Sequence, residues 1–300
     1  MNSTVAFLQA PLRSAGLPMA ICVIPALLLL IATTLFPLLA VLLLSFSDYQ
    51  LGGLSLHWIG LTNFERIATS DTASRAIVNT LIFTAMVVPA SVGLGLLLAL
   101  LVRGRNRTRR LYELLLFLPL TATMTVMAIV WSLLLHERIG PVNAVLKALG
   151  LAPIAFLSDV ETVLPSLALI AIWQQASFCF VFFLAGLTAI PGELYEAAAL
   201  DRVGSGWERF RRITWPLLAP TTLVVVLLTT IKAFQAFDLV AVLTQGGPQD
   251  ASLVLLYETY LEAFSYFRIG YGSALTMLFV VFVGAVSALQ MWSARREIAR

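Results

Sequence analysis

The sequence predicts an all-α integral membrane protein that crosses the bilayer six times. Its 300 residues are 60% hydrophobic and only 12% charged, whereas soluble domains carry about 25% charged residues. The mean hydropathy is +0.93, so one soluble core cannot enclose the apolar side chains. Six apolar runs reach the ~20 residues that a helical span requires. Basic residues gather between alternate runs, which is typical of a multi-pass membrane protein.

The predicted spans are the longest apolar runs of the chain, and residues 1–300 are expected to form one transmembrane domain. The spans cover residues 18–46, 75–102, 111–135, 163–188, 217–244 and 270–292. The first is longer than the apolar region of a signal peptide, so we expect it to be retained. Pro25 and Pro37 should bend it, because neighbouring groups in a membrane bundle can satisfy the freed backbone.

Basic residues predict the orientation of the spans. The connections that include both ends of the chain hold 13 arginines, whereas the other connections hold five basic residues. Both termini and the connection 189–216 are therefore predicted to be cytoplasmic. The run RGRNRTRR (103–110) is interpreted as an anchor on anionic lipid headgroups. Because these arginines lie beside apolar spans, no nucleic-acid partner is expected.

The cytoplasmic connection 189–216 reads as a helix, a turn and a second helix. Pro191 suits a first helical turn, the alanines 197–199 are strong helix formers, and Gly204 is a suitable stop. Ser205, with Glu208 three residues later, forms a capping box for the second helix. A short isolated helix is marginal in water. The first helix could therefore rest on the span ends or dock on another protein, and helix physics alone leaves both open.

The segment IPGELYEAAALDRVGSGWERFRRITWPLLAP (190–220) resembles the EAA loop of membrane-spanning subunits in binding-protein-dependent ABC importers. Residues 172–191 are similar to the same family's approach to this loop. FDLVAVLTQGGP (237–248) resembles the first permease subunit of carbohydrate importers. The chain departs from the family in two ways: Arg202 stands where glycine is usual, and the spacing from Glu196 to Pro216 is one residue longer.

The resemblance implies a type I ABC importer-like permease in the cytoplasmic membrane of a bacterium or archaeon. Its partners would be a second homologous permease, two cytoplasmic ATPase subunits and an extracytoplasmic solute-binding protein. The chain lacks the Gly-Lys-Ser/Thr of a P-loop, so it is expected to be no enzyme and to hold no cofactor, with ATP and Mg²⁺ used by the ATPase. The coupling residues that the resemblance assigns are Glu196, Ala197, Ala198, Asp201, Gly204, Phe210 and Pro216.

Polar side chains within the spans are expensive in a bilayer and therefore mark a candidate translocation pathway. Lys232, Gln235 and Asp238 are spaced i, i+3 and i+6, which places them on one broad helical face. The alternative is that such groups only join helices by hydrogen bonds. The candidate pathway residues are Asn79, Trp173, Gln174, Gln175, Lys232, Gln235 and Asp238.

The expected solute is a sugar, a related polyol or a glycerol phosphate, with a neutral sugar favoured because no span centre holds an arginine. An ion-coupled secondary carrier is the alternative, with Lys232 and Asp238 as coupling groups. No evident repeat of the kind common in such carriers is found, and the EAA-like segment also disfavours it. His57 and His136 are isolated, so no metal site is expected. An intramembrane enzyme would need a nucleophile–base set, which the sequence does not offer.

Overall fold

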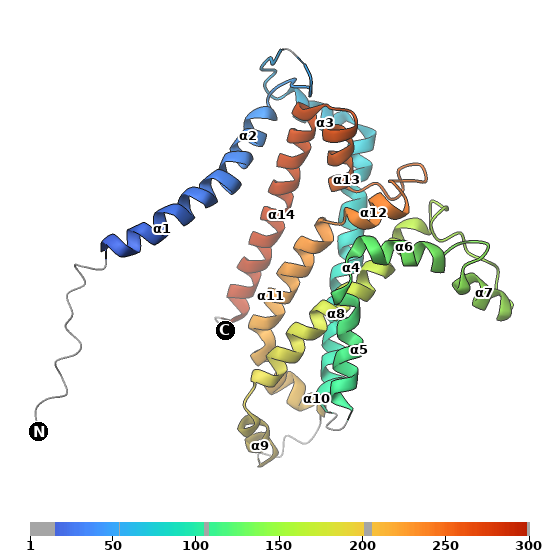
Figure 1. The fold of residues 1–300 in the computed structure, drawn as a ribbon. Coiled ribbons are helices and arrows are strands. Elements are labelled where there is room, and N and C mark those ends of the chain that lie inside the picture. The colour runs from blue at the N-terminus through green and yellow to red at the C-terminus, as the bar shows by residue number, and fades with distance from the viewer. Residues whose placement is uncertain (1–15, 54, 105–107, 201–205, 299–300) are drawn as a thin grey trace, which may run out of the picture.

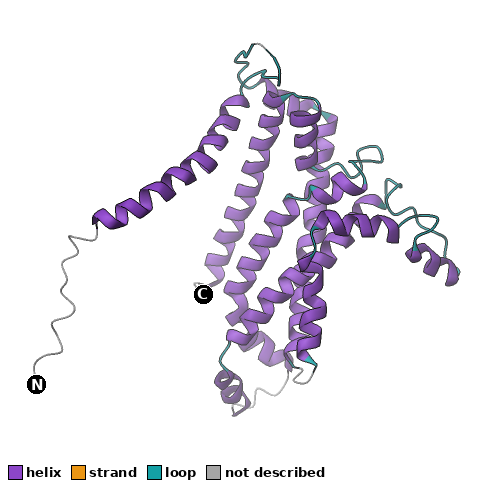
Figure 2. Cartoon of the chain, in the orientation of Figure 1, coloured by secondary structure: helices purple, strands orange, loops and turns teal. Residues whose placement is uncertain are grey.

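The computed structural model describes residues 16–53, 55–104, 108–200 and 206–298. These residues form helices joined by loops (Figure 2). An isolated β-bridge joins Ser47 and Trp58. The helices are α1 (Gly16–Leu30), α2 (Phe36–Leu44), α3 (Thr62–Thr69), α4 (Asp71–Arg103), α5 (Arg109–Thr121), α6 (Met124–Leu134), α7 (Pro141–Ala148), α8 (Val163–Ala189), α9 (Gly192–Leu200), α10 (Gly206–Arg209), α11 (Trp215–Phe234), α12 (Asp238–Leu243), α13 (Leu255–Tyr260) and α14 (Ile269–Ile298). Three π-helical turns cover Ile31–Leu35, Phe210–Thr214 and Leu261–Ser265.

The long helices α4, α8, α11 and α14 form the bundle (Figure 1). Helices α9 and α10 lie at one end of it, and α3 and α13 lie toward the other. We call these the α9 end and the α13 end. Within the described residues, five helical stretches are long and apolar enough to cross a membrane, or six if α5 and α6 form one broken span. The all-α fold with six predicted crossings is consistent with this count.

The first span is made of α1, a π-helical turn and α2. It leans away from the bundle and contacts α14 through α2 (Figure 1). Its most apolar window, within Val23–Leu44, has no buried residue. Two prolines were expected to bend this span, and Pro25 lies inside α1 while Pro37 lies in the first turn of α2. The span therefore presents apolar side chains around its surface, as a helix facing lipid or another membrane protein does.

The third predicted span, residues 111–135, contains a sharp break. Helices α5 and α6 meet at an angle of 98°. Ala122, between them, has an extended backbone with φ −93° and ψ 143°. Pro119 in the last turn of α5 lacks an N–H and weakens the helix there. The side-chain amide of Gln174 on α8 donates to the carbonyl oxygens of Pro119 and Ala122, at 3.4 and 3.1 Å, and so satisfies backbone that the break frees.

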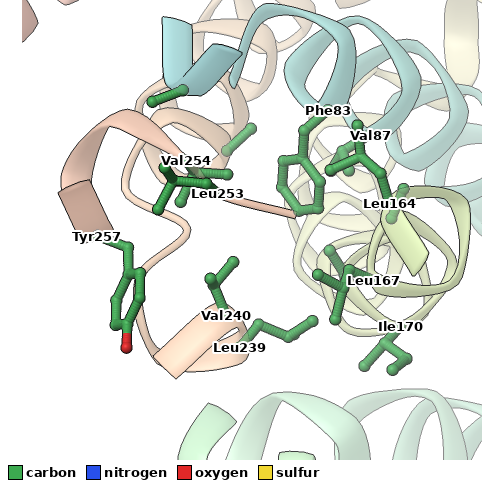
Figure 3. Packing of buried hydrophobic residues seen from close by; sticks show 14 of the residues in the cluster. Phe83, Val87, Leu164, Leu167, Ile170, Leu239, Val240, Leu253, Val254 and Tyr257 are labelled. Atoms are coloured by element: carbon green, nitrogen blue, oxygen red, sulfur yellow. The ribbon is translucent and has the colours of Figure 1, made fainter. Parts of the chain in front are cut away.

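The fifth span was predicted as one helix over 217–244, and it is also interrupted. Helix α11 ends at Phe234, and Gln235 leaves helical geometry with φ −84° and ψ 22°. Helix α12 begins at Asp238. Leu239 and Val240 of α12 are buried against Phe83 of α4 and the first half of α8 (Figure 3). This apolar contact holds the short helix in place after the break.

Helices α4 and α8 make the most extensive contact in the bundle. Gly95 lies at their crossing, where a Cβ would overlap the side chain of Cys179 and lie 2.9 Å from the backbone nitrogen of Phe180. Ala99, Phe180, Phe183 and Leu187 form a buried cluster around this point. A small residue here lets two membrane helices approach closely, which is how such helices gain packing energy in lipid.

Candidate functional site

Helix α9 is fastened to the bundle through Tyr195. Nη1 of Arg103, the last residue of α4, donates a hydrogen bond to the Tyr195 hydroxyl at 2.8 Å. The same hydroxyl lies 2.9 Å from Oγ1 of Thr214, which ends the π-helical turn before α11. The Arg103 guanidinium also sits 4.5 Å from the centre of the Tyr195 ring. We call these three residues the clamp; it joins α9 to α4 and α11.

Helix α9 has both exposed and buried side chains among its described positions. Leu194, Glu196 and Ala197 are exposed, whereas Ala198 is only 6% exposed. Ala198 was assigned to coupling together with Glu196 and Ala197, and its burial sets it apart from these two exposed residues. The predicted coupling residues Asp201 and Gly204, like the predicted cap Ser205, lie outside the described residues.

Phe210 begins the π-helical turn Phe210–Thr214 that leads from α10 into α11. Its ring stacks on Trp207, with centroids 5.6 Å apart, and lies 6.0 Å from Trp215. Pro216 occupies the first turn of α11, where its missing N–H leaves no hydrogen bond unmade. A π-helical turn fits one additional residue into a helix. The turn lies within the stretch from Glu196 to Pro216, which is one residue longer than is usual in the family that it resembles.

A cavity of about 270 Å³ lies at the break between α11 and α12. We call it the central cavity. Five of the seven candidate pathway residues line it, although they come from two separate helical regions. The lining residues include Gln174, Gln175, Lys232, Gln235 and Asp238, with Phe83, Met124, Ala171 and Phe237 among the apolar ones. Lys232, Gln235 and Asp238 were expected to share a helical face. They meet because the helix breaks between them.

The Lys232 side chain is oriented by an aromatic ring. Its Nζ lies 3.7 Å from the centre of the Phe178 ring on α8, which is a cation–π contact. Lys232, Gln235 and Asp238 are all exposed in the isolated chain, so the central cavity is open on one side. Such polar groups within a span require water, solute or a further protein surface beside them.

The other predicted pathway residues have structural partners. The Asn79 side-chain amide donates to the carbonyl oxygens of Asp250 and Leu253, at 2.8 and 2.9 Å, and ties α4 to the loop after α12. Trp173 packs edge-on against Trp131, with ring centres 5.7 Å apart, and does not line the central cavity. Gln174 lines the cavity and also bonds the break in the third span.

Sequence reasoning missed the clamp and the contribution of Met124. Arg103 was counted only as a lipid anchor, and Tyr195 was not singled out. They lie 92 residues apart, so no local spacing signals their contact. Met124 reaches the central cavity because α6 turns sharply away from α5. Among the described residues, no group of three or more His, Cys, Asp or Glu side chains could hold a metal ion.

Comparison with known proteins decides the family. Residues 75–298 match the family model described as "binding-protein-dependent transport system inner membrane component". The chain belongs to this family. It is therefore a multi-pass subunit of the inner membrane, and the family is one of transport permeases rather than enzymes. The match begins at the predicted second span, so it includes the clamp, α9 and the central cavity.

Two relatives are named for the transport of sn-glycerol-3-phosphate and of trehalose/maltose. The chain is 32% identical to the sn-glycerol-3-phosphate transport system permease protein UgpA of Agrobacterium fabrum, over 79% of this chain and 81% of that protein. It is 33% identical to the trehalose/maltose transport system permease protein MalF of Thermococcus litoralis, over 75% and 76%. The structure of a bacterial alginate ABC transporter, in complex with an alginate pentasaccharide-bound periplasmic protein, has the same fold, with a TM-score of 0.84, 22% identity and coverage of 95% and 96%. The recognition of an ABC importer permease and the all-α, multi-span fold class are confirmed. The resemblance of residues 237–248 to a first permease subunit and the cytoplasmic placement of both termini stay predictions.

Proposed function

We propose that this permease is one membrane half of an ATP-driven importer for a neutral sugar or polyol. A second, homologous permease completes the pathway, two ATPase subunits dock at the α9 end, and an extracytoplasmic binding protein delivers the solute at the α13 end. The observation that carries the proposal is the clamp. The clamp connects α9, which lies in the segment that resembles the EAA loop, to α4 and α11. Helix α11 in turn reaches the central cavity.

The coupling step follows from how α9 is attached. Exposed Leu194, Glu196 and Ala197 offer the ATPase a surface of one acid and small or aliphatic side chains. Because Tyr195 bonds both Arg103 and Thr214, a push on α9 moves the ends of α4 and α11 together. Helix α4 packs along α8, so the displacement reaches Gln174 and Gln175. Packed helices transmit such shifts because their interfaces do not deform continuously.

The lining of the central cavity favours a neutral, hydroxyl-rich solute. Lys232 and Asp238 provide one positive and one negative charge, and Gln175 and Gln235 provide amide donors and acceptors. No arginine is among its described lining residues, whereas a phosphate group is commonly held by arginine forks. The open side of the cavity, next to exposed Lys232 and Asp238, is where the second permease would contribute the remaining contacts.

Reconstitution tests the proposal. The complex of both permeases and the ATPase is placed in liposomes with the binding protein outside, and uptake of labelled sugars is followed with and without internal ATP. The predicted result is uptake that requires ATP, while the isolated chain neither hydrolyses ATP nor accumulates solute. Uptake by this chain alone, driven by an ion gradient, would contradict the proposal and support a secondary carrier.

A charge reversal separates coupling from assembly. Glu196→Lys places the wrong charge on the exposed side of α9 and should abolish solute-stimulated ATP hydrolysis while the complex still assembles. Glu161→Lys, at an exposed acid in the loop before α8, is the matched control. It should retain solute-stimulated ATP hydrolysis and should assemble normally. Normal transport by Glu196→Lys would mean that α9 is only a linker.

A further inference from the structure

A second cavity, of about 590 Å³, lies at the α13 end. We call it the outer cavity. It forms where α3, the loop after α12, α13, the π-helical turn Leu261–Ser265 and the start of α14 meet, and Figure 1 shows α3 and α13 at the end remote from α9. Its lining is mainly polar and shares no residue with the central cavity. Its charged lining residues are Arg66, Asp250, Glu258, Glu262 and Arg268.

The two arginines of the outer cavity are already engaged. Arg268 Nε lies 2.9 Å from Glu262 Oε2, and its guanidinium lies 5.1 Å from the centre of the Tyr266 ring. Arg66 stacks 5.2 Å from the centre of the Tyr271 ring and acts electrostatically on Glu262. Glu262 is thus compensated by two positive charges, and both arginines are held by aromatic rings.

Glu258 forms no ion pair in the described part of the chain, and Arg268 acts on it only electrostatically. Glu258 is 5% exposed, lines the outer cavity, and accepts no hydrogen bond from any group in the described part of the chain. A buried carboxylate without a partner is destabilising, so this position calls for a donor or a positive charge. The charged and titratable groups that face it across the cavity are Arg66 of α3, Asp250 of the loop, Glu262 of the π-helical turn, and Arg268 and Tyr271 at the start of α14. When all the acids are ionised, the five charged groups of the lining carry one excess negative charge.

We propose that the outer cavity receives one lysine or arginine side chain of the solute-binding protein, whose cationic head pairs with Glu258. This inference rests on the proposed function, which places that partner at the α13 end. One excess negative charge calls for one monovalent cation. The volume also accommodates the aliphatic stem of a long basic side chain, which such residues bury while their charged head finds a polar partner.

Proton binding competes with this pairing. Burial, followed by the neighbouring carboxylates of Glu262 and Asp250, raises the pKa of Glu258 to about 7. At pH 8 the carboxyl is mostly ionised, whereas at pH 6 only about one-tenth is. Docking should therefore weaken as the pH falls from 8 to 6, and the weakening should depend on this one side chain.

The test measures binding of the solute-loaded binding protein to the complete transporter in lipid nanodiscs at pH 8 and pH 6. For the wild type we expect affinity about tenfold weaker at pH 6, following the ionised fraction. Glu258→Gln should be about tenfold weaker at pH 8 and should lose the difference between the two pH values. Glu258→Asp keeps the charge and should keep the pH dependence. Glu161→Gln, the matched exposed acid, should behave as the wild type. Because one binding protein serves all variants, its own titration cancels in the comparison.

Three outcomes would overturn the inference, and only the last of them would also overturn the proposed function. If Glu258→Gln binds as the wild type does at both pH values while transport continues, the outer cavity is not a docking site and the proposed function stands. In a second outcome, ammonium chloride raises the thermal midpoint of the wild type above its value in sodium chloride at equal ionic strength, but does not do so for Glu258→Gln. If Glu258→Gln also binds the solute-binding protein as the wild type does, the outer cavity holds a free cation instead. If the wild-type transporter binds no such protein at either pH, the proposed function fails as well.

Discussion

The guanidinium of Arg103 both donates to the Tyr195 hydroxyl, at 2.8 Å, and covers the Tyr195 ring, at 4.5 Å from its centre. Two kinds of contact thus join the last residue of α4 to a helix of only nine residues, Gly192–Leu200. So short a helix has little stability of its own in water. Its orientation therefore depends on this contact and on Thr214.

Tyr195→Phe tests whether the clamp couples α9 to the bundle. The change removes the hydroxyl that contacts Arg103 and Thr214 but keeps the ring. The loss should be about 1 kcal/mol per hydrogen bond, so we expect solute transported per ATP hydrolysed to fall severalfold with little change in assembly. Tyr260→Phe, at an exposed ring near the α13 end, controls for loss of a hydroxyl. An unchanged ratio in Tyr195→Phe would show that the clamp does not transmit force.

Lys232→Met tests the central cavity. The variant keeps an unbranched side chain but loses the charge and the contact with Phe178 at 3.7 Å, an interaction worth about 0.5–2 kcal/mol. The concentration of solute-loaded binding protein that half-saturates uptake is not expected to change, whereas the maximal rate should drop severalfold. Lys147→Met, at an exposed lysine of α7, is the matched control. Equal transport rates for the two variants would remove Lys232 from the pathway.

Gly95→Ala tests the close approach of α4 and α8. The added methyl would overlap Cys179 and lie 3.0 Å from the carbonyl oxygen of Ala176. Overpacking of this kind costs about 1–3 kcal/mol, so the thermal midpoint of the purified subunit should fall. Gly93→Ala, two residues away, places its methyl where nothing lies within 4 Å, and should leave the midpoint unchanged or raise it slightly. If both variants unfold at the same temperature, the crossing is looser than the structure indicates.

Glu258 should make stability depend on pH. Its pKa is about 7 in the folded chain, against an ordinary value of 4.5, so the folded state binds this proton more tightly than the unfolded state does. The stabilisation is complete below pH 4.5 and is lost as the pH rises to 7, by about 3 kcal/mol. We therefore expect the thermal midpoint of the wild type to drop between pH 5 and pH 8. Glu258→Gln should drop less, and an identical pH profile for both proteins would contradict this origin.

Hydropathy can indicate candidate spans because the requirement for about 20 apolar residues is local. The interruptions were not predictable in the same way. Pro119 signals a weak point, but the 98° turn also needs Gln174, which comes from another helix 52 residues or more along the chain. Such long-range hydrogen bonds leave no periodic signal in the sequence.

The candidate site also combines residues that the sequence could indicate with contacts that only the fold shows. Lys232, Gln235 and Asp238 drew attention as polar groups in an apolar run, and the structure gathers them around one cavity. The reason differs from the one expected, because α11 ends at Phe234 and the three do not share a helix. Asn79 drew attention by the same rule, yet it bonds two backbone carbonyls. Polarity within a span therefore indicates that a residue has a partner, and only the fold shows whether that partner is backbone or cavity.

The most direct measurement of the central claim is a site-specific cross-link from α9. Cysteine is introduced at exposed Ala197 in a chain whose two native cysteines are replaced by alanine, and a short bifunctional thiol reagent is applied to the working transporter. The account predicts a cross-link to the ATPase subunit whose yield changes between the nucleotide-free and ATP-bound states. A transporter that imports solute normally while residue 197 cross-links to no ATPase in either state would contradict it.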